Sequence, residues 1–304
     1  MNPARRFLTF ACLSFFAVLP GLAVAETPPL PSPVPVDGAI ELPGAARETP
    51  HFQSFRADYK VTRSVLDSDF TLASADLRLE LGSEGGYRYS SNLRPAKLIA
   101  LFYGDELAEY SRGHLEDEGV RPDLYEMRLS GRKAREGSIV FDREAGVVVQ
   151  RFKGREVRQG VPPEAHDRLS LQLEMARDLA AGRRAMQYLM VDRNRLRVYR
   201  FEVKGEERIE TPLGSYETLR VELAGRLRLE DAAGLDVDTV HTETDLSGED
   251  QTTFWFAPML GHLPVRIRHE DEDLGTFTMS IERLEMPLAL RAQAQGVTVG
   301  AASP

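Results

Sequence analysis

Apolar and polar residues alternate along several segments of this 304-residue chain, and this period of two constrains the fold more than any other feature. The clearest segments are 55–61, 77–81, 199–203, 219–223 and 277–281. In the first of them, Phe, Ala, Tyr and Val alternate with Arg, Asp and Lys. Successive side chains of a β-strand point to opposite faces, so each segment buries one face and exposes the other. That pattern is typical of antiparallel sheets.

Further strand candidates lie between the clear ones and are separated by glycine-containing turns. These weaker segments are 86–91, 104–114, 123–130, 137–142, 145–153, 186–192, 251–257 and 264–270. Together the segments make about a dozen strands. Sheets of that size curl, close or split rather than stay flat. We therefore predict a mostly β fold, with one large antiparallel curled sheet that is half-barrel or barrel-like.

One segment departs from this pattern and predicts a single α-helix over residues 167–181. Asp167 is a good N-cap residue, and Gly182 suits the end of the helix. Four residues at helical spacing make an apolar stripe: Leu169, Leu173, Ala176 and Ala180. Such a stripe has to be covered by other apolar surface. We expect this helix to pack on the sheet or to fill the mouth of a barrel.

The amino-terminal residues have the layout of a secretory signal peptide. Arg5 and Arg6 precede an apolar run over 7–19, and Ala23-Val24-Ala25 matches a cleavage site. The alternative, a membrane anchor, is less favoured because the run is shorter than the roughly 20 residues that cross a bilayer. The predicted organisation is a signal peptide (1–25), a Pro-rich linker (26–50), one β domain (51–286) and a flexible tail (287–304).

Composition excludes several classes of function. Cys12, the only cysteine, lies inside the predicted leader, so the processed chain has no disulfide and no thiolate nucleophile. The formal net charge of −9 disfavours nucleic acid as a partner. The chain has 33 arginines and five lysines. Arginine forks bind carboxylate and phosphate, which suggests an anionic head group. Codon bias in a GC-rich genome is the simpler explanation and the favoured one.

The sequence carries no strong catalytic or cofactor motif. It has no nucleophile elbow, phosphate-binding glycine loop, zinc-protease helix or calcium loop, and we predict no cofactor and no catalytic residues. One weak candidate metal site is His241, Glu243 and Asp245, which share one face if the segment is extended. The surrounding residues are rich in Thr, Asp and Glu, so a solvated hairpin end is the favoured interpretation.

Three other segments have a functional and a structural interpretation. His166 and Asp167 could form a base and its orienting group, but Asp167 as a helix cap and Arg168 as an ion-pair partner are favoured. The run Phe254-Trp255-Phe256 could stack on a ligand, but a core strand is favoured. The acidic run 270–273 could hold calcium loosely, but a solvated turn between two strands is favoured.

Several short motifs, in order, resemble an exported bacterial family known as domain of unknown function 3108. The resemblance spans residues 52–285. Its motifs are Phe55-Arg56-Ala57-Asp58-Tyr59, 117–125, Phe141-Asp142, Val161-Pro162, 167–171, 177–179, 205–207, 211–214, Trp255-Phe256-Ala257-Pro258 and 263–267. The resemblance implies an all-β periplasmic fold and assigns no activity, so it carries no site residues to this chain.

Three hypotheses for function follow, in order of preference. The first is a non-catalytic periplasmic protein that binds or carries an apolar or amphipathic ligand, such as lipid, in the cell envelope. The second is a protein–protein interaction module of the envelope. The third is a hydrolase with an unrecognised site. In each case we expect no nucleic-acid partner and no membrane span once the leader is removed.

The leader makes a prediction of its own. Protein recovered from the periplasm should begin at Glu26, because a signal peptidase cuts after small residues at the last and third-last leader positions. Intact mass measurement checks this. Ala25→Arg should leave the leader attached, whereas an untouched Met1 on the normal protein would contradict the prediction.

Overall fold

The computed structural model describes residues 52–286, apart from 66–67, 97–99, 101–104, 132–133, 194, 231, 243–250 and 272–274. In this part of the chain, fourteen strands form one sheet, accompanied by helix α3 (Ser170–Ala180). The strands are β1 (Phe55–Val65), β2 (Ser68–Leu81), β3 (Gly86–Pro95), β4 (Leu107–Glu116), β5 (Gly119–Leu129), β6 (Arg135–Asp142), β7 (Val147–Phe152), β8 (Arg155–Gly160), β9 (Ala185–Asp192), β10 (Arg195–Thr211), β11 (Gly214–Leu229), β12 (Gln251–Ala257), β13 (Leu263–Asp271) and β14 (Gly275–Glu285). The prediction of one large antiparallel curled sheet with one packed helix is confirmed.

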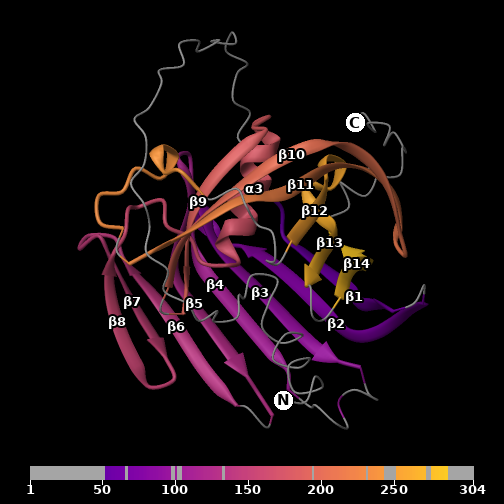
Figure 1. The fold of residues 1–304 in the computed structure, drawn as a ribbon, viewed down its shortest axis with the longest axis horizontal. Helices are drawn as coiled ribbons and strands as arrows, with labels where there is room; N and C mark the ends of the chain where they lie inside the picture. The colour runs from indigo at the N-terminus through magenta and orange to yellow at the C-terminus, as the bar shows by residue number, and fades with distance from the viewer. Residues whose placement is uncertain are drawn as a thin grey trace, which may run out of the picture.

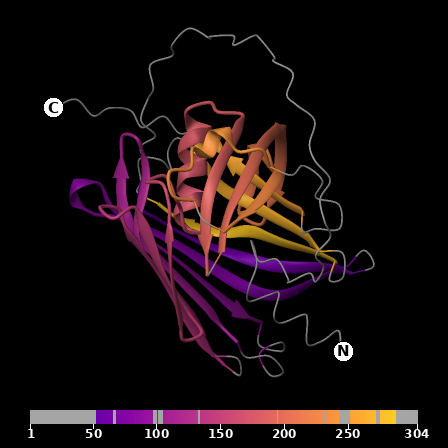
Figure 2. The ribbon, with the colours of Figure 1, turned by 60° about the vertical axis from the view of Figure 1, so that its left-hand side comes forward.

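The sheet consists of two meanders joined in the middle. Its strand order is β8-β7-β6-β5-β4-β3-β2-β1-β14-β13-β12-β11-β10-β9, and every neighbouring pair is antiparallel. Only the pairing of β1 with β14 joins strands that are distant in sequence, with Tyr59 opposite Ile281. Helix α3 therefore connects the two outermost strands, β8 and β9. Figures 1 and 2 show how the sheet bends round so that these two ends approach each other.

Helix α3 lies on the concave face and is held there by polar contacts from three strands. The Tyr89 hydroxyl of β3 donates to Gln172 Oε1 at 3.1 Å. The backbone N–H of Val120 in β5 donates to a Glu174 carboxylate oxygen at 2.6 Å, and the Tyr188 hydroxyl of β9 donates to Asp178 at 2.8 Å. Eight residues of α3 are buried, far more than one apolar stripe requires.

Apolar side chains fill the space between the helix and the sheet. The largest fully buried ones come from both meanders and include Tyr59, Tyr89, Tyr199, Phe201, Phe254, Phe256, Leu171 and Met175. Neighbouring rings lie in contact, with the Phe254 and Phe256 centroids 5.7 Å apart. In the described residues, the interior of the curled sheet is therefore a packed core. Such densely packed apolar interiors leave little space for a ligand.

The structure corrects three details of the sequence prediction. Helix α3 begins at Ser170 rather than Asp167, because the Asp167 carboxylate stays outside the helix and accepts the N–H groups of Leu169 and Ser170. Ala180 is exposed, although it belongs to the predicted apolar stripe. Strand β8 was not predicted, because Val157 is its only large apolar residue. The glycine end is confirmed: Gly182 has φ +81, which a glycine adopts without strain.

The chain that leads into α3 lies along the edge of β9. This segment runs parallel to β9, with the His166 N–H donating to the Leu189 carbonyl at 2.9 Å and the Val191 N–H donating to the His166 carbonyl at 2.8 Å. At the β9–β10 turn, the Arg193 guanidinium lies over the Phe152 ring at 5.5 Å. The sheet is thus curled, but no ladder of strands closes it among the described residues. A non-strand segment covers the edge of β9.

The buried segment His166-Asp167-Arg168 also binds the sheet through its side chains. Asp167 also accepts the Ser111 hydroxyl of β4 at 2.7 Å, so its carboxylate joins the helix start to the sheet. The Arg168 guanidinium lies 3.2 Å from the Glu109 carboxylate, which in turn accepts the Tyr125 hydroxyl. Both structural interpretations from the sequence, the cap and the ion pair, are confirmed.

Removing the Asp167 carboxylate should destabilise the protein strongly. Asp167→Ala leaves two N–H groups and the buried Ser111 hydroxyl without an acceptor, so we expect the free energy of unfolding to fall by about 2–4 kcal/mol. Urea unfolding measures this. The matched control is Asp236→Ala, an exposed carboxylate that accepts one N–H at a short turn, which should cost less than about 1 kcal/mol. Equal losses would contradict the anchoring role of Asp167.

His166 should make stability depend on pH. Burial lowers the pKa of His166 to about 3, helped by the charges of Arg121, Arg143 and Arg177. The unfolded chain binds this proton near pH 6.5, so unfolding should become easier as the pH falls from 6.5 towards 3, by up to about 1.4 kcal/mol per pH unit. Urea unfolding of the normal protein and of His166→Gln between pH 7 and 4.5 tests this. Parallel pH profiles would refute it.

Candidate ligand-binding site at the rim of the sheet

The weak metal candidate falls mostly outside the described residues. His241 is exposed, shortly after the turn at 237–239, while Glu243 and Asp245 lie in the segment that the structure does not describe. Within the described residues, no group of three or more His, Cys, Asp or Glu side chains is placed to hold a metal ion. The metal hypothesis for His241, Glu243 and Asp245 stays a prediction.

The aromatic run belongs to the core, as favoured from the sequence. Phe254 and Phe256 of β12 are fully buried on the concave face. Trp255 points to the outer face but is only 4% exposed, because Arg268 lies over its ring at 5.4 Å and its indole N–H donates to Glu207 at 2.9 Å. These contacts cover the ring that a stacked ligand would need. The acidic run also fits the sequence prediction, since β13 ends at Asp271 and β14 begins at Gly275.

Ser111, His166 and Asp167 lie near one another, but their arrangement is not that of an activated nucleophile. The Ser111 hydroxyl donates directly to Asp167, and it also lies 3.0 Å from the Tyr87 hydroxyl. His166 Nδ1 has no hydrogen-bond partner. A serine nucleophile needs a base within hydrogen-bond distance and access to substrate, whereas Ser111 and Asp167 are fully buried. The cluster acts as a structural anchor.

A small apolar hollow lies at the rim, where α3 meets the first strands and the β12–β13 turn. Its volume is about 40 Å³. The apolar side chains that line it include Phe55, Leu79, Leu173, Ala176, Leu260 and Met286. Leu79 and Leu173 are buried, while Phe55 and Met286 are partly exposed at the mouth. The hollow brings together the beginning and the end of the described chain and the middle of the helix.

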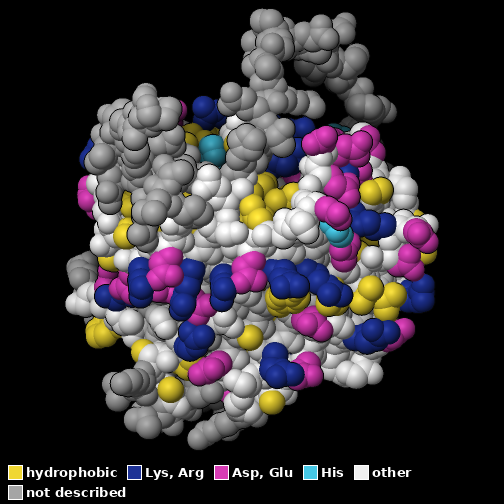
Figure 3. Space-filling view, turned by 180° about the vertical axis from the view of Figure 1, so that it is seen from behind, with side chains coloured by type: hydrophobic (Ala, Val, Ile, Leu, Met, Phe, Trp, Pro, Cys, Tyr) yellow, Lys and Arg dark blue, Asp and Glu magenta, His cyan; other side chains and the backbone are white. Residues whose placement is uncertain are grey.

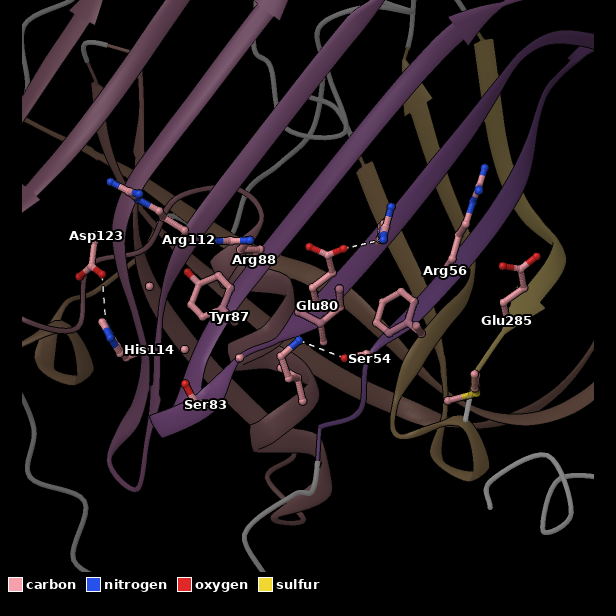
Figure 4. Close-up of a pocket in the computed structure, with 18 residues that line it drawn as sticks. Ser54, Arg56, Glu80, Ser83, Tyr87, Arg88, Arg112, His114, Asp123 and Glu285 are labelled. Atoms are coloured by element: carbon pink, nitrogen blue, oxygen red, sulfur yellow. Dashed lines mark hydrogen bonds and ion pairs between the residues drawn. The ribbon is translucent and has the colours of Figure 1, made fainter. Parts of the chain in front are cut away.

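A second, open hollow of about 1060 Å³ adjoins the first and extends over the outer face of β1–β4. The two share Phe55, Leu79 and Met286. Charged side chains dominate the outer hollow and are drawn in Figure 4: Arg56, Arg78, Glu80, Arg88, Arg112, His114, Asp123 and Glu285. The rim therefore offers an apolar surface on its inner side and guanidinium groups on its outer side.

Ion pairs compensate many of these outer charges. Arg78 lies 2.6 Å from Glu80 on the same strand, and His114 lies 3.2 Å from Asp123. Figure 3 shows a comparable band of basic and acidic side chains lying side by side across one face of the molecule. Such exposed pairs add little stability, about 0–1 kcal/mol each, but they keep the charge of the surface nearly balanced.

A third hollow, of about 660 Å³, lies beside the segment that leads into α3. The residues that line it include His166, Glu174, Asp178 and Tyr188. Burial, followed by the nearby Glu174 charge, raises the pKa of Asp178 above its ordinary value. Its carboxylate accepts the Tyr188 hydroxyl and lies 3.4 Å from the Arg183 guanidinium. These groups already hold α3 in place, so the hollow at the rim is the better candidate site.

The sequence identified several residues that line the apolar hollow, but it did not show that they lie close together. The alternation in 55–61 and 77–81 predicted that Phe55 and Leu79 share the buried face, and the helical stripe included Leu173 and Ala176. Nothing in the local sequence placed the β12–β13 turn against the helix. Arg88 and Arg112 were not singled out, because isolated exposed arginines on strands are ordinary in a chain with 33 of them.

Comparison with known proteins identifies the family. Within the described residues, no helix is long and apolar enough to cross a membrane. None of the curated proteins compared with the chain matches it. One similar solved structure is a β-barrel-like protein of domain of unknown function DUF1849 from Brucella abortus, with 12% sequence identity. The alignment covers 77% of this chain and 98% of that protein's chain, and the TM-score of 0.51 shows a shared fold.

Two other solved structures are more distant. An exported protein with a YmcC-like fold from Bacteroides fragilis is 10% identical and covers 78% of this chain and 97% of its own, with a TM-score of 0.32. An outer membrane lipoprotein-sorting protein domain from Vibrio parahaemolyticus is 9% identical and covers 77% and 85%, with a TM-score of 0.27. The model of one family, the protein of unknown function DUF3108, matches residues 54–282, and the chain belongs to that family.

Proposed function

We propose that this chain is a non-catalytic periplasmic binding protein for an amphipathic ligand, which it holds at the rim of the sheet. The observation that carries the proposal is the junction of two unlike hollows. An apolar one lies between α3 and the first strands, and it meets a charged, open one at Phe55, Leu79 and Met286. Ligand sites combine an apolar lining with a few polar groups that fix orientation.

The predicted export of the protein favours a ligand from the cell envelope. The leader over 1–25 has the features of a cleavable export signal, and lipids and other amphipathic molecules are abundant in the periplasm's bounding membranes. The packed interior argues against a ligand enclosed in the centre of the sheet. At the rim, Phe55 and Met286 remain partly exposed beside the apolar hollow.

The apolar hollow is small and has to widen before it can hold an apolar chain. Its volume of about 40 Å³ is close to the roughly 30 Å³ that one water molecule occupies in the liquid. An apolar chain enters by displacing Phe55 and Met286, which are only partly buried. Each buried methylene of the ligand then contributes about 0.8 kcal/mol, which offsets the cost of moving those side chains.

Extraction of the native protein tests the proposal. Protein purified from its own periplasm without detergent is extracted with organic solvent, and the extract is analysed by mass spectrometry. We expect a lipid or fatty acid in near-stoichiometric amount. Ala176→Phe fills the hollow and should lower the bound amount about five-fold or more, which corresponds to a loss of about 1 kcal/mol of binding free energy.

The matched control is Ala180→Phe, which makes the same substitution one turn further along α3 at an exposed position. It should keep the bound ligand. Urea unfolding of both variants separates loss of binding from loss of folding, since overfilling a site costs about 1–3 kcal/mol of stability. A clean extract from the normal protein would refute the proposal and favour the envelope interaction module, which crosslinking in cells would then address.

A further inference from the structure

We propose that Arg88 and Arg112 together bind the anionic head group of the ligand, a phosphate, sulfate or carboxylate, on the outer side of the rim. This inference rests on the proposed function and names its ligand class, an amphipathic anion. Both side chains belong to neighbouring strands, Arg88 to β3 and Arg112 to β4, and both line the open hollow. Figure 4 shows them next to each other.

The two arginines occupy directly opposite positions in the ladder between β3 and β4. Tyr87 and Tyr89 point into the core, so Arg88 between them points outward. Ser111 and Gly113 are buried in the same way on either side of Arg112. Opposite residues on one face of an antiparallel pair have Cβ atoms about 4.5–5.5 Å apart, and like charges in that arrangement destabilise the sheet. A bound anion removes that repulsion.

The carboxylates around the two arginines have other partners. Glu80 lies directly opposite Arg88 in the register with β2, but it pairs with Arg78 at 2.6 Å. Glu285 pairs with Arg283. Within the described residues, neither Arg88 nor Arg112 has an ion-pair partner or a hydrogen-bonded acceptor for its guanidinium.

Asp123, the third carboxylate of the hollow, is held away by a β-bulge. Arg112 lies opposite Leu124 and Gly113 lies opposite Pro122, so Asp123 is the extra residue of β5. It lies 3.2 Å from His114 and 3.7 Å from Arg143. Bulges change the direction of side chains, and this one leaves Arg112 without an acid across the strand pair. Within the described residues, two guanidinium groups therefore face the hollow without an ion pair of their own.

The position of this pair fits an amphipathic anion better than a free one. Arg88 lies opposite Glu80, and Glu80 follows Leu79, which lines both hollows. A molecule whose tail lies between Phe55 and α3 therefore crosses the rim next to Arg88. Two guanidinium forks on adjacent strands bind one tetrahedral or planar oxyanion through several charge-assisted hydrogen bonds, which lysines do not reproduce.

Binding of lipids with one chain and different head groups tests the inference. The probes are oleoyl lysophosphatidylglycerol, which is anionic, oleoyl lysophosphatidylcholine, which is zwitterionic, and uncharged mono-oleoylglycerol, each titrated below its micelle concentration into the delipidated processed protein. Isothermal titration and native mass spectrometry give the dissociation constants. We expect the anionic probe to bind at least about ten-fold more tightly than the uncharged one, and less tightly at high salt.

The double variant Arg88→Gln/Arg112→Gln should weaken binding of the anionic probe at least about ten-fold and leave the uncharged probe within about two-fold. Replacement of both arginines by lysine should restore only part of the affinity, because the charge is kept and the fork is lost. The matched control is Arg155→Gln/Arg158→Gln on β8, which removes the same charge from two exposed arginines outside the rim. It should bind all probes as the normal protein does.

Failure of the inference and failure of the proposed function give different results. If all three lipids bind equally to the normal protein and to the double variant, the head-group site is wrong and the apolar site stands. If no lipid binds, but sn-glycerol 3-phosphate shifts the guanidinium NMR signals of Arg88 and Arg112, the anion site stands and takes a free phosphate instead. If neither lipid nor glycerol phosphate binds, both proposals are wrong.

Discussion

The buried carboxylate of Asp167 is the interaction on which the rest of this structure depends. It joins the two N–H groups at the start of α3 to the Ser111 hydroxyl of β4, so the helix begins at a fixed point on the concave face. The chain just before it runs along β9 and covers the edge of that strand. Asp167 thus fixes where the helix begins against the sheet, next to the segment that covers the edge of β9. An unpaired charge there would be expensive to bury, and the three hydrogen-bond donors around the carboxylate reduce that cost.

The helix in turn decides where a ligand can bind. A curled sheet with an empty concave face would enclose a cavity, but α3 and the aromatic side chains of both meanders occupy this one. In the proposed function, binding takes place at the rim, where Phe55 and Met286 remain partly exposed. The change from apolar to charged surface occurs over the thickness of one sheet, because neighbouring residues such as Leu79 and Glu80 point to opposite faces. An amphipathic molecule that crosses the rim meets both surfaces.

Charge pairing gives the outer face its character. Arginine and glutamate two residues apart on one strand, such as Arg78 and Glu80 or Arg268 and Glu270, lie on the same face and form ion pairs. This arrangement keeps a face with many arginines close to neutral. Arg88 and Arg112 differ from this pattern, because they lie directly opposite each other and neither forms an ion pair within the described residues.

The local sequence determined most of the strands, the existence of the helix, the sheet class and the buried side of the clearly alternating strands. These features depend on periods of two and 3.6 that neighbouring residues carry. It also determined the cap at Asp167 and the core position of Phe254, since both follow from residue type within a short segment. Only the tertiary structure decided that β1 pairs with β14, that α3 lies inside the curl, and that Arg88 faces Arg112 while Glu80 turns to Arg78. Those outcomes depend on contacts between residues far apart in the chain. Many alternative registers satisfy the same local pattern, and only packing of the whole sheet around one helix selects among them.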